Sequence, residues 1–263
     1  MRSVFPHASK VVIGMLHLPP LPGSPGFGSS LDAIYRTVLN DAKALEAGGV
    51  HGLMMENFGD IPFFPGRVPS FVVAQMTAIA TEVRRVSKLP LGINVLRNDG
   101  LSALSVAVAS GASFIRVNVL SGARVCDQGL LQGIAHDLLR ERALLQANHI
   151  KILADVDVKH SAPLAARPVA DEVDDTINRG LADGVIVSGA GTGKPTDLGK
   201  LQVVKAAAGD TPVFLGSGVT ASSIASFLPH ADGFIVGTAF KEGGDVAKPV
   251  DVQRVRELIA KFA

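Results

Sequence analysis

Polar and charged side chains stand at the ends of several short apolar runs in this chain. They are His17, Glu56, Asn94, Arg116, Asn118, Asp155, Asp157, Lys159, His160 and Ser188. Histidine, carboxylate and lysine side chains can transfer protons, and amide, hydroxyl and guanidinium groups can orient the oxygens of a ligand. Because burying an unpaired charge is costly, we expect these groups to be paired, hydrated in a pocket or in contact with a ligand.

The candidates for catalysis are His17, Glu56, Asp155 and Lys159. The histidine and the two carboxylates could act as general acid and base, and Lys159 could form a Schiff base or contact a phosphate. Glu56 and Asp155 could instead hold a divalent cation together with water and substrate oxygens. No closely spaced ligand motif supports a metal, so we assign neither a metal ligand nor a cofactor. The alternative is that a neighbouring arginine or lysine simply neutralises each carboxylate.

The segment Asp155-Val156-Asp157-Val158-Lys159 alternates charged and apolar residues. Side chains two residues apart lie on the same face of a strand. The pattern therefore predicts that Asp155, Asp157 and Lys159 face the same way.

Two apolar runs near the C-terminus end in glycine-rich turns, Gly216-Ser217-Gly218 and Gly237-Thr238. Glycine lets the backbone approach an anion closely. In (β/α)8 barrels, the loops after the seventh and eighth strands frequently bind a phosphate. We therefore predict that these turns hold the phosphate group of a small-molecule ligand.

The segment from Ser188 to Lys194 resembles a nucleotide-binding P-loop only superficially. The first glycine position of that motif is Ser188 here, and its final Ser or Thr position is Pro195. The hydroxyl that binds the metal is therefore missing, and proline cannot donate an N–H. We expect either an ordinary surface loop or a loop that closes over a bound anion. The contacts expected of a closing loop are Ser188, Gly189, Thr192 and Lys194.

Short apolar runs alternate with longer amphipathic segments along the 263 residues. The runs are rich in Val, Ile and Leu, which is typical of parallel strands buried on both faces. The predicted strands are 11–16, 52–56, 91–95, 114–119, 152–158, 184–187, 213–215 and 233–236. This repetition favours an α/β fold in which residues 1–263 form a single (β/α)8 TIM barrel. A doubly wound open sheet is the alternative, but a proline-rich loop follows the first strand where a Gly-x-Gly-x-x-Gly turn is usual.

Apolar residues at helical spacing predict helices between the strands. One stripe runs from Val72 to Val83, a second from Leu130 to Leu145, and a third from Val252 to Phe262.

The composition argues against several classes of function. The formal net charge is +1, tryptophan is absent and there is one tyrosine, so we expect no nucleic-acid partner. No apolar stretch approaches the ~18 residues of a membrane span, and no signal-peptide core is seen near Met1. The single cysteine excludes an intrachain disulfide and fits a cytoplasmic protein.

Five blocks of the sequence resemble the BtpA/SgcQ family. They are 12–25, 56–60, 114–118, 155–161 and 187–193, and the first, VIGMLHLPPLPGSP, is long and unusual. The resemblance implies a (β/α)8 barrel of the ribulose-phosphate-binding type. The cyanobacterial namesake of the family is implicated in photosystem I biogenesis, and other members resemble products of sugar-metabolism gene clusters. No reaction follows from the resemblance.

The residues favour an enzyme that acts on a phosphorylated small molecule, either a sugar phosphate or a nucleotide-like compound. Acid–base pairs serve isomerisation, aldol-type cleavage and glycosidic hydrolysis, so the sequence does not choose among an isomerase, a lyase and a hydrolase. The alternative is a non-catalytic assembly or regulatory factor, as suggested for photosystem I biogenesis, that keeps a ligand-binding barrel. In either case we expect a homo-oligomer.

Overall fold

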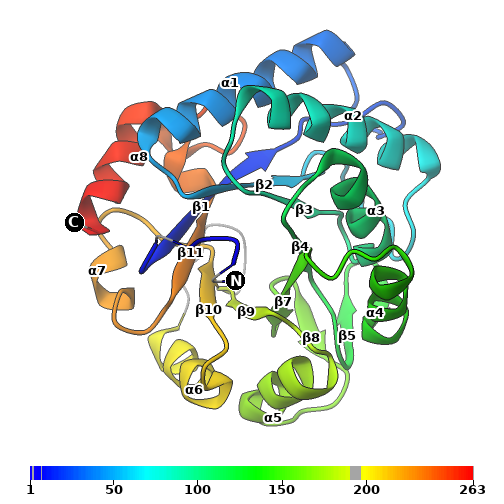
Figure 1. Ribbon diagram of the computed structural model, residues 1–263, viewed down its shortest axis with the longest axis vertical. Helices are drawn as coiled ribbons and strands as arrows, with labels where there is room; N and C mark the ends of the chain where they lie inside the picture. The colour runs from blue at the N-terminus through cyan, green and yellow to red at the C-terminus, as the bar shows by residue number, and fades with distance from the viewer. Residues whose placement is uncertain (2, 7, 190–196, 263) are drawn as a thin grey trace.

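The computed structural model describes residues 1, 3–6, 8–189 and 197–262. Within them, parallel strands close into a barrel in the order β1–β11–β10–β9–β7–β4–β3–β2 (Figure 1). The barrel strands are β1 (Val11–His17), β2 (Gly52–Glu56), β3 (Leu91–Asn94), β4 (Phe114–Val117), β7 (Lys151–Val156), β9 (Gly184–Val187), β10 (Val213–Gly216) and β11 (Gly233–Val236). The prediction of a (β/α)8 barrel is confirmed.

Helices surround the barrel and cover the outer faces of its strands (Figure 1). They are α1 (Leu31–Gly48), α2 (Ser70–Val86), α3 (Gly100–Ser110), α4 (Ala135–Leu144), α5 (Val169–Asp174), α6 (Leu198–Ala208), α7 (Ile224–Phe227) and α8 (Val252–Ile259). The side chains of Ser30, Asp99 and Asp251 cap α1, α3 and α8 by accepting backbone N–H bonds. Within the described residues, no helix is long and apolar enough to cross a membrane.

A small antiparallel sheet interrupts the strand–helix repeat after β4. Its strands are β5 (Ala123–Cys126), β6 (Gly129–Gln132) and β8 (Ser161–Pro163), in the order β6–β5–β8. Leu130 and Leu131 therefore belong to a strand, and the prediction that the helix starts at Leu130 is wrong. Short apolar runs do not distinguish a strand from a helix by spacing alone, and here the pairing of β6 with β5 decides.

Large side chains fill the barrel interior at the amino ends of the strands. Phe114, Phe214 and Ile235 pack there with Phe5, whose ring meets that of Phe114 edge to face at 5.9 Å. The N-terminal segment that carries Phe5 lies over the centre of the ring of strands (Figure 1). Because this end is filled, the polar carboxyl ends of the strands are left to form the site.

Candidate functional site

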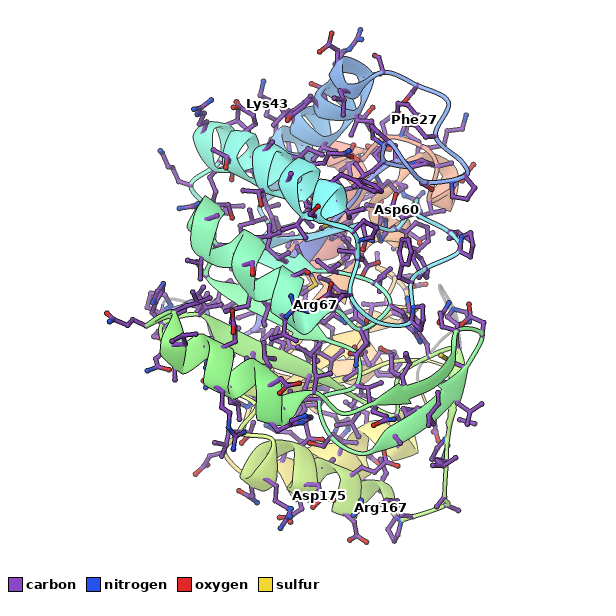
Figure 2. The ribbon with its side chains drawn as sticks, turned by 90° about the vertical axis from the view of Figure 1, so that its right-hand side faces the viewer. Phe27, Lys43, Asp60, Arg67, Arg167 and Asp175 are labelled. Carbon is purple, nitrogen blue, oxygen red and sulfur yellow. The ribbon has the colours of Figure 1, made fainter. Side chains whose placement is uncertain are left out.

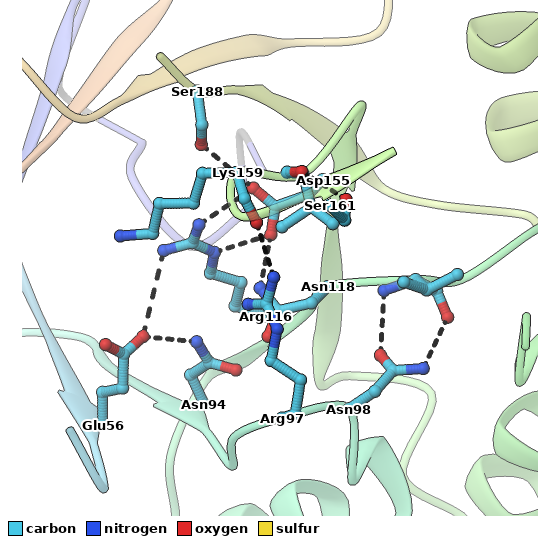
Figure 3. A network of polar contacts seen from close by, with 12 residues as sticks. Glu56, Asn94, Arg97, Asn98, Arg116, Asn118, Asp155, Lys159, Ser161 and Ser188 are labelled. Carbon is cyan, nitrogen blue, oxygen red and sulfur yellow. Dashed lines mark hydrogen bonds and ion pairs between the residues drawn. The ribbon is translucent and has the colours of Figure 1, made fainter. Parts of the chain in front are cut away.

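A buried polar network joins the carboxyl ends of neighbouring strands, with Asp155 of β7 at its centre (Figure 3). Arg116 donates from Nε and Nη2 to the two Asp155 oxygens, each at 2.9 Å. Asn118 donates to Asp155 at 2.7 Å, and the Ser188 hydroxyl also donates to Asp155, at 3.2 Å. Burial disfavours the charge on Arg116, but the carboxylates of Asp155 and Glu56 outweigh it and raise the pKa of Arg116. The network therefore holds a rigid, charged arginine at the barrel mouth.

The carboxylate of Asp155 is surrounded by these partners, although the residue lines a separate cavity with Asn118 and Asp157. Its side chain is 0% exposed, and both carboxylate oxygens accept hydrogen bonds. It does not line either of the cavities that contain Glu56. The geometry thus makes Asp155 a residue that positions Arg116 and Asn118.

Glu56, the last residue of β2, is the carboxylate that faces the open end of the barrel. Its Oε2 accepts a hydrogen bond from Asn94 at 2.5 Å and lies 4.0 Å from Nη1 of Arg116. Glu56 is therefore oriented through one oxygen while its carboxylate borders the cavities.

A cavity of about 190 Å³ joins the acid–base candidates to the glycine turns. Its lining includes His17, Glu56, Arg116, Lys159, Gly216, Ser217, Gly218, Gly237, Thr238, Gly244 and Arg254. The structure thus brings together side chains from β1, β2, β4 and the segment after β7 with the turns after β10 and β11. The predicted phosphate-binding turns and most of the predicted proton-transfer residues face one space.

The two glycine turns need their glycines for different reasons. Gly218 has a φ of +69°, which side chains other than glycine rarely adopt. At Gly237, a Cβ atom would lie 2.6 Å from Cε1 of His17, so the histidine fits only against a glycine. The second turn therefore shapes the position of His17 as well as the cavity wall.

Arg254 of α8 is a cavity residue that the sequence reasoning missed. Its Nε donates to the carbonyl of Ala239 at 2.9 Å, which fixes the guanidinium beside the second glycine turn. A positive charge at this position complements a phosphate. The residue lies in a C-terminal helix rather than at a strand end, so only its tertiary contact indicates a role.

His17 and Lys159 both lie in surroundings that disfavour their charged forms. The His17 ring packs on Phe58 with centroids 4.6 Å apart, and its Nδ1 is buried with no hydrogen-bond partner among the described residues. Desolvation lowers the pKa of His17 to about 4, so the ring is neutral at pH 7. Burial also lowers the pKa of Lys159, although the nearby Glu56 carboxylate opposes the change. A lysine with a lowered pKa is better suited to proton transfer or nucleophilic attack.

The predicted alignment of Asp155, Asp157 and Lys159 is wrong. Strand β7 ends at Val156, and Asp157 has a φ of +54°, so the alternation of faces stops there. Asp157 instead pairs with Arg124 of β5 and, at 2.5 Å, with Lys200 of α6. Burial works against its charge, but Lys200 and then Arg124 outweigh this and lower the pKa of Asp157. The backbone turn thus takes Asp157 away from Glu56 and Lys159 and into a different cavity, which it lines with Asp155 and Asn118.

The chain matches the family model described as BtpA family over residues 8–263. It belongs to the BtpA family. It is 46% identical over 252 residues to the photosystem I biogenesis protein BtpA of Synechocystis, covering 96% of this chain and 88% of that protein. It is 45% identical over 250 residues to an uncharacterized protein of Thermococcus kodakarensis, covering 95% of this chain and 94% of that protein.

Among solved structures, the BtpA-family chain is similar to N-(5'-phosphoribosyl)anthranilate isomerase from Pyrococcus furiosus. The TM-score is 0.60 at 13% sequence identity, covering 97% of this chain and 100% of that one. At this identity the similarity shows a shared barrel fold, and the site has to be interpreted from its own residues.

The remaining predicted contacts of this BtpA-family barrel fall into separate places. His160 has a φ of +58° and lines a second cavity beside Lys159. The Ser188 hydroxyl donates a hydrogen bond to Asp155, and Gly189 is the last residue of the described segment 8–189. Thr192 and Lys194 lie outside the described residues.

The hypothesis of a divalent cation between Glu56 and Asp155 does not agree with the geometry. Arg116 contacts both carboxylates, at 4.0 Å and 2.9 Å, and so occupies the position a cation would need. In the described part of the chain, no group of three or more His, Cys, Asp or Glu side chains could hold a metal ion.

Proposed function

We propose that this BtpA-family protein is an enzyme that binds a phosphorylated small molecule at the barrel mouth and transfers protons on it. The observation that carries the proposal is the shared cavity, which has glycine turns and Arg254 on one side and Glu56 and Lys159 on the other. Glycine backbone and a fixed guanidinium suit a phosphate, while a carboxylate and a lysine with a lowered pKa suit proton transfer.

The roles follow from the contacts of each side chain. In this proposal Glu56, held by Asn94, acts as the base, and Lys159 acts as the acid that donates to an oxygen gaining charge. Arg116 orients substrate oxygens, and Asp155 holds Arg116 in place. This pairing supports isomerisation or aldol-type cleavage. It favours them over hydrolysis by two carboxylates, because Asp155 is saturated by its partners.

A non-catalytic assembly factor is the second candidate, favoured by the name of the Synechocystis relative. The Thermococcus relative is nearly as similar, and its name carries no photosystem role. The buried charged site at the barrel mouth favours the small-molecule enzyme over this alternative. A cytoplasmic location and a homo-oligomeric state stay predictions.

Binding is tested by isothermal titration calorimetry with ribose 5-phosphate and with ribose. We expect ribose 5-phosphate to bind at least tenfold more tightly than ribose. Arg254→Met should weaken the binding of ribose 5-phosphate at least tenfold, because it removes the charge beside the glycine turn. Arg256→Met, an exposed arginine on the same helix, is the matched control and should leave binding unchanged. Equal affinity for the two sugars, or an unaffected Arg254→Met variant, contradicts the phosphate site.

Catalysis is tested by incorporation of solvent deuterium into ribose 5-phosphate, followed by NMR. Incorporation by the wild type and its loss in Glu56→Gln support a proton-transfer enzyme. A wild-type protein that binds the sugar phosphate without exchange favours the assembly-factor alternative.

A further inference from the structure

A second cavity adjoins the first at the acid–base residues. It has a volume of about 570 Å³ and shares Glu56, Arg116 and Lys159 with the 190 Å³ cavity at the glycine turns. Small-molecule sites usually have volumes of roughly 300–1,000 Å³. The first cavity alone is below that range, so a ligand of ordinary size that reaches the glycine turns also extends past Glu56 into the second cavity.

The second cavity has an apolar and partly aromatic wall. Phe58, Ile61, Pro62 and Phe63 from the β2–α2 loop line it together with Leu96 after β3. Ile61 is 59% exposed, although it is a large apolar side chain. Exposed apolar groups around a cavity are typical of a ligand-binding groove, and phenylalanine rings favour a flat partner.

Arg97 places a buried positive charge on the same cavity. It is 4% exposed, and its Nη2 donates to the backbone carbonyl of Lys159 at 2.5 Å (Figure 3). Its Nε is buried without a hydrogen-bond partner, and Arg97 forms no ion pair with a carboxylate in the described part of the chain. Arg116, the other buried arginine on this cavity, is paired to Asp155. Glu56 and Asp127, both among the described residues, also line this cavity, but neither forms an ion pair with Arg97. A buried guanidinium without a paired carboxylate is costly, so Arg97 favours an oxygen acceptor in the cavity.

We propose that the second cavity binds a planar ring carrying an oxygen acceptor, which Arg97 and the phenylalanine wall recognise. The inference rests on the proposed function, because the phosphate of the same ligand occupies the glycine turns. The substrate is then a phosphorylated compound with an unsaturated ring at the end opposite its phosphate. The atoms between ring and phosphate lie at Glu56 and Lys159. The acceptor is a ring carbonyl or a ring carboxylate.

Isothermal titration calorimetry with three phosphorylated compounds, which differ in the ring they carry, tests this assignment. They are ribose 5-phosphate, uridine 5'-monophosphate, which adds a ring with carbonyls, and orotidine 5'-monophosphate, which adds a carboxylate to that ring. We expect at least one nucleotide to bind tenfold or more tightly than ribose 5-phosphate. A gain for both indicates the carbonyl, and a gain for orotidine 5'-monophosphate alone indicates the carboxylate.

Two cavity variants and one control locate the ring. Arg97→Met and Ile61→Ser should each reduce the advantage of the nucleotide and leave the affinity for ribose 5-phosphate unchanged. Ile61 is exposed, so its substitution does not threaten folding. Arg67→Met changes an exposed arginine that lines neither cavity and should behave as the wild type.

The failure of this inference differs from the failure of the proposed function. Equal binding of all three phosphates, or a nucleotide advantage that survives both cavity variants, overturns the ring site and leaves the phosphate site standing. Absence of binding by all three overturns the phosphate site and the ring site together.

Discussion

Glu56 and Asp155 carry the same functional group at equivalent strand ends, yet their neighbours give them different chemistry. The side chain of Asp155 is fully buried and accepts hydrogen bonds from Arg116, Asn118 and Ser188. Glu56 is held by Asn94 and borders both mouth cavities. Residue type and strand position predicted both as candidates. Only the partners distinguish a carboxylate that positions an arginine from one that can meet a substrate.

His17 predicts a pH dependence of stability. An unfolded histidine takes up a proton near its usual pKa of about 6.5, whereas folded His17 does so only near a pKa of about 4. Protonation therefore favours the unfolded state as the pH falls from 6.5 towards 4, and the contribution is fully present above pH 6.5. Between pH 7 and pH 4.5 the wild type should lose about 2 kcal/mol more unfolding free energy than His17→Gln, measured by urea denaturation. Equal losses would contradict the buried neutral histidine.

At the scale of elements, the Asp155 carboxylate of β7 accepts hydrogen bonds from Arg116 of β4 and from Ser188, which follows β9, and so connects the carboxyl ends of three strands. Asp155→Asn should lower the free energy of unfolding by about 3–5 kcal/mol, because Arg116 stays buried with only Glu56 at 4.0 Å. Guanidinium denaturation measures the change. Asp210→Asn, an exposed position, should change stability by less than about 0.5 kcal/mol. A loss below about 1 kcal/mol in Asp155→Asn would show that the network contributes little to stability.

The elements that the sequence predicted well are those whose pattern is long and whose pairing is regular. Helix α2, with its stripe from Val72 to Val83, and the barrel strands are of this kind. The hairpin of β5 and β6 was missed because Leu130 and Leu131 also fit a helical stripe. The turn at Asp157 was missed because alternation continues in the sequence after the strand has ended.

At the scale of the whole molecule, the two ends of the barrel have separate tasks. The loops that carry Phe27 and Asp60 lie on one side of the barrel in the view of Figure 2, at the end where the strands deliver their polar residues. The other end is filled by Phe5 and the aromatic residues around it. In barrels of this kind, function belongs to the carboxyl end of the strands and stability to the opposite end.

Phe5→Ala should therefore affect stability without affecting the site. Phe5 is 7% exposed, and its removal leaves a void against Phe114, so we expect a loss of about 3 kcal/mol in unfolding free energy. The dissociation constant for ribose 5-phosphate should stay within twofold of the wild-type value. A large change in affinity without a change in stability would contradict the separation of the two ends.

The sequence by itself determined the barrel, the strand ends that carry polar residues and the glycine turns near the C-terminus. It could do so because apolar runs, helical spacing and glycine-rich turns are local patterns, which can be recognised from residues that are neighbours in the sequence. The tertiary structure alone decided that the Asp155 carboxylate is surrounded by donors, that Asp157 turns to Lys200, and that Arg254 borders the first cavity. These outcomes depend on which residues far apart in the chain meet after the barrel closes, and no local pattern contains that information.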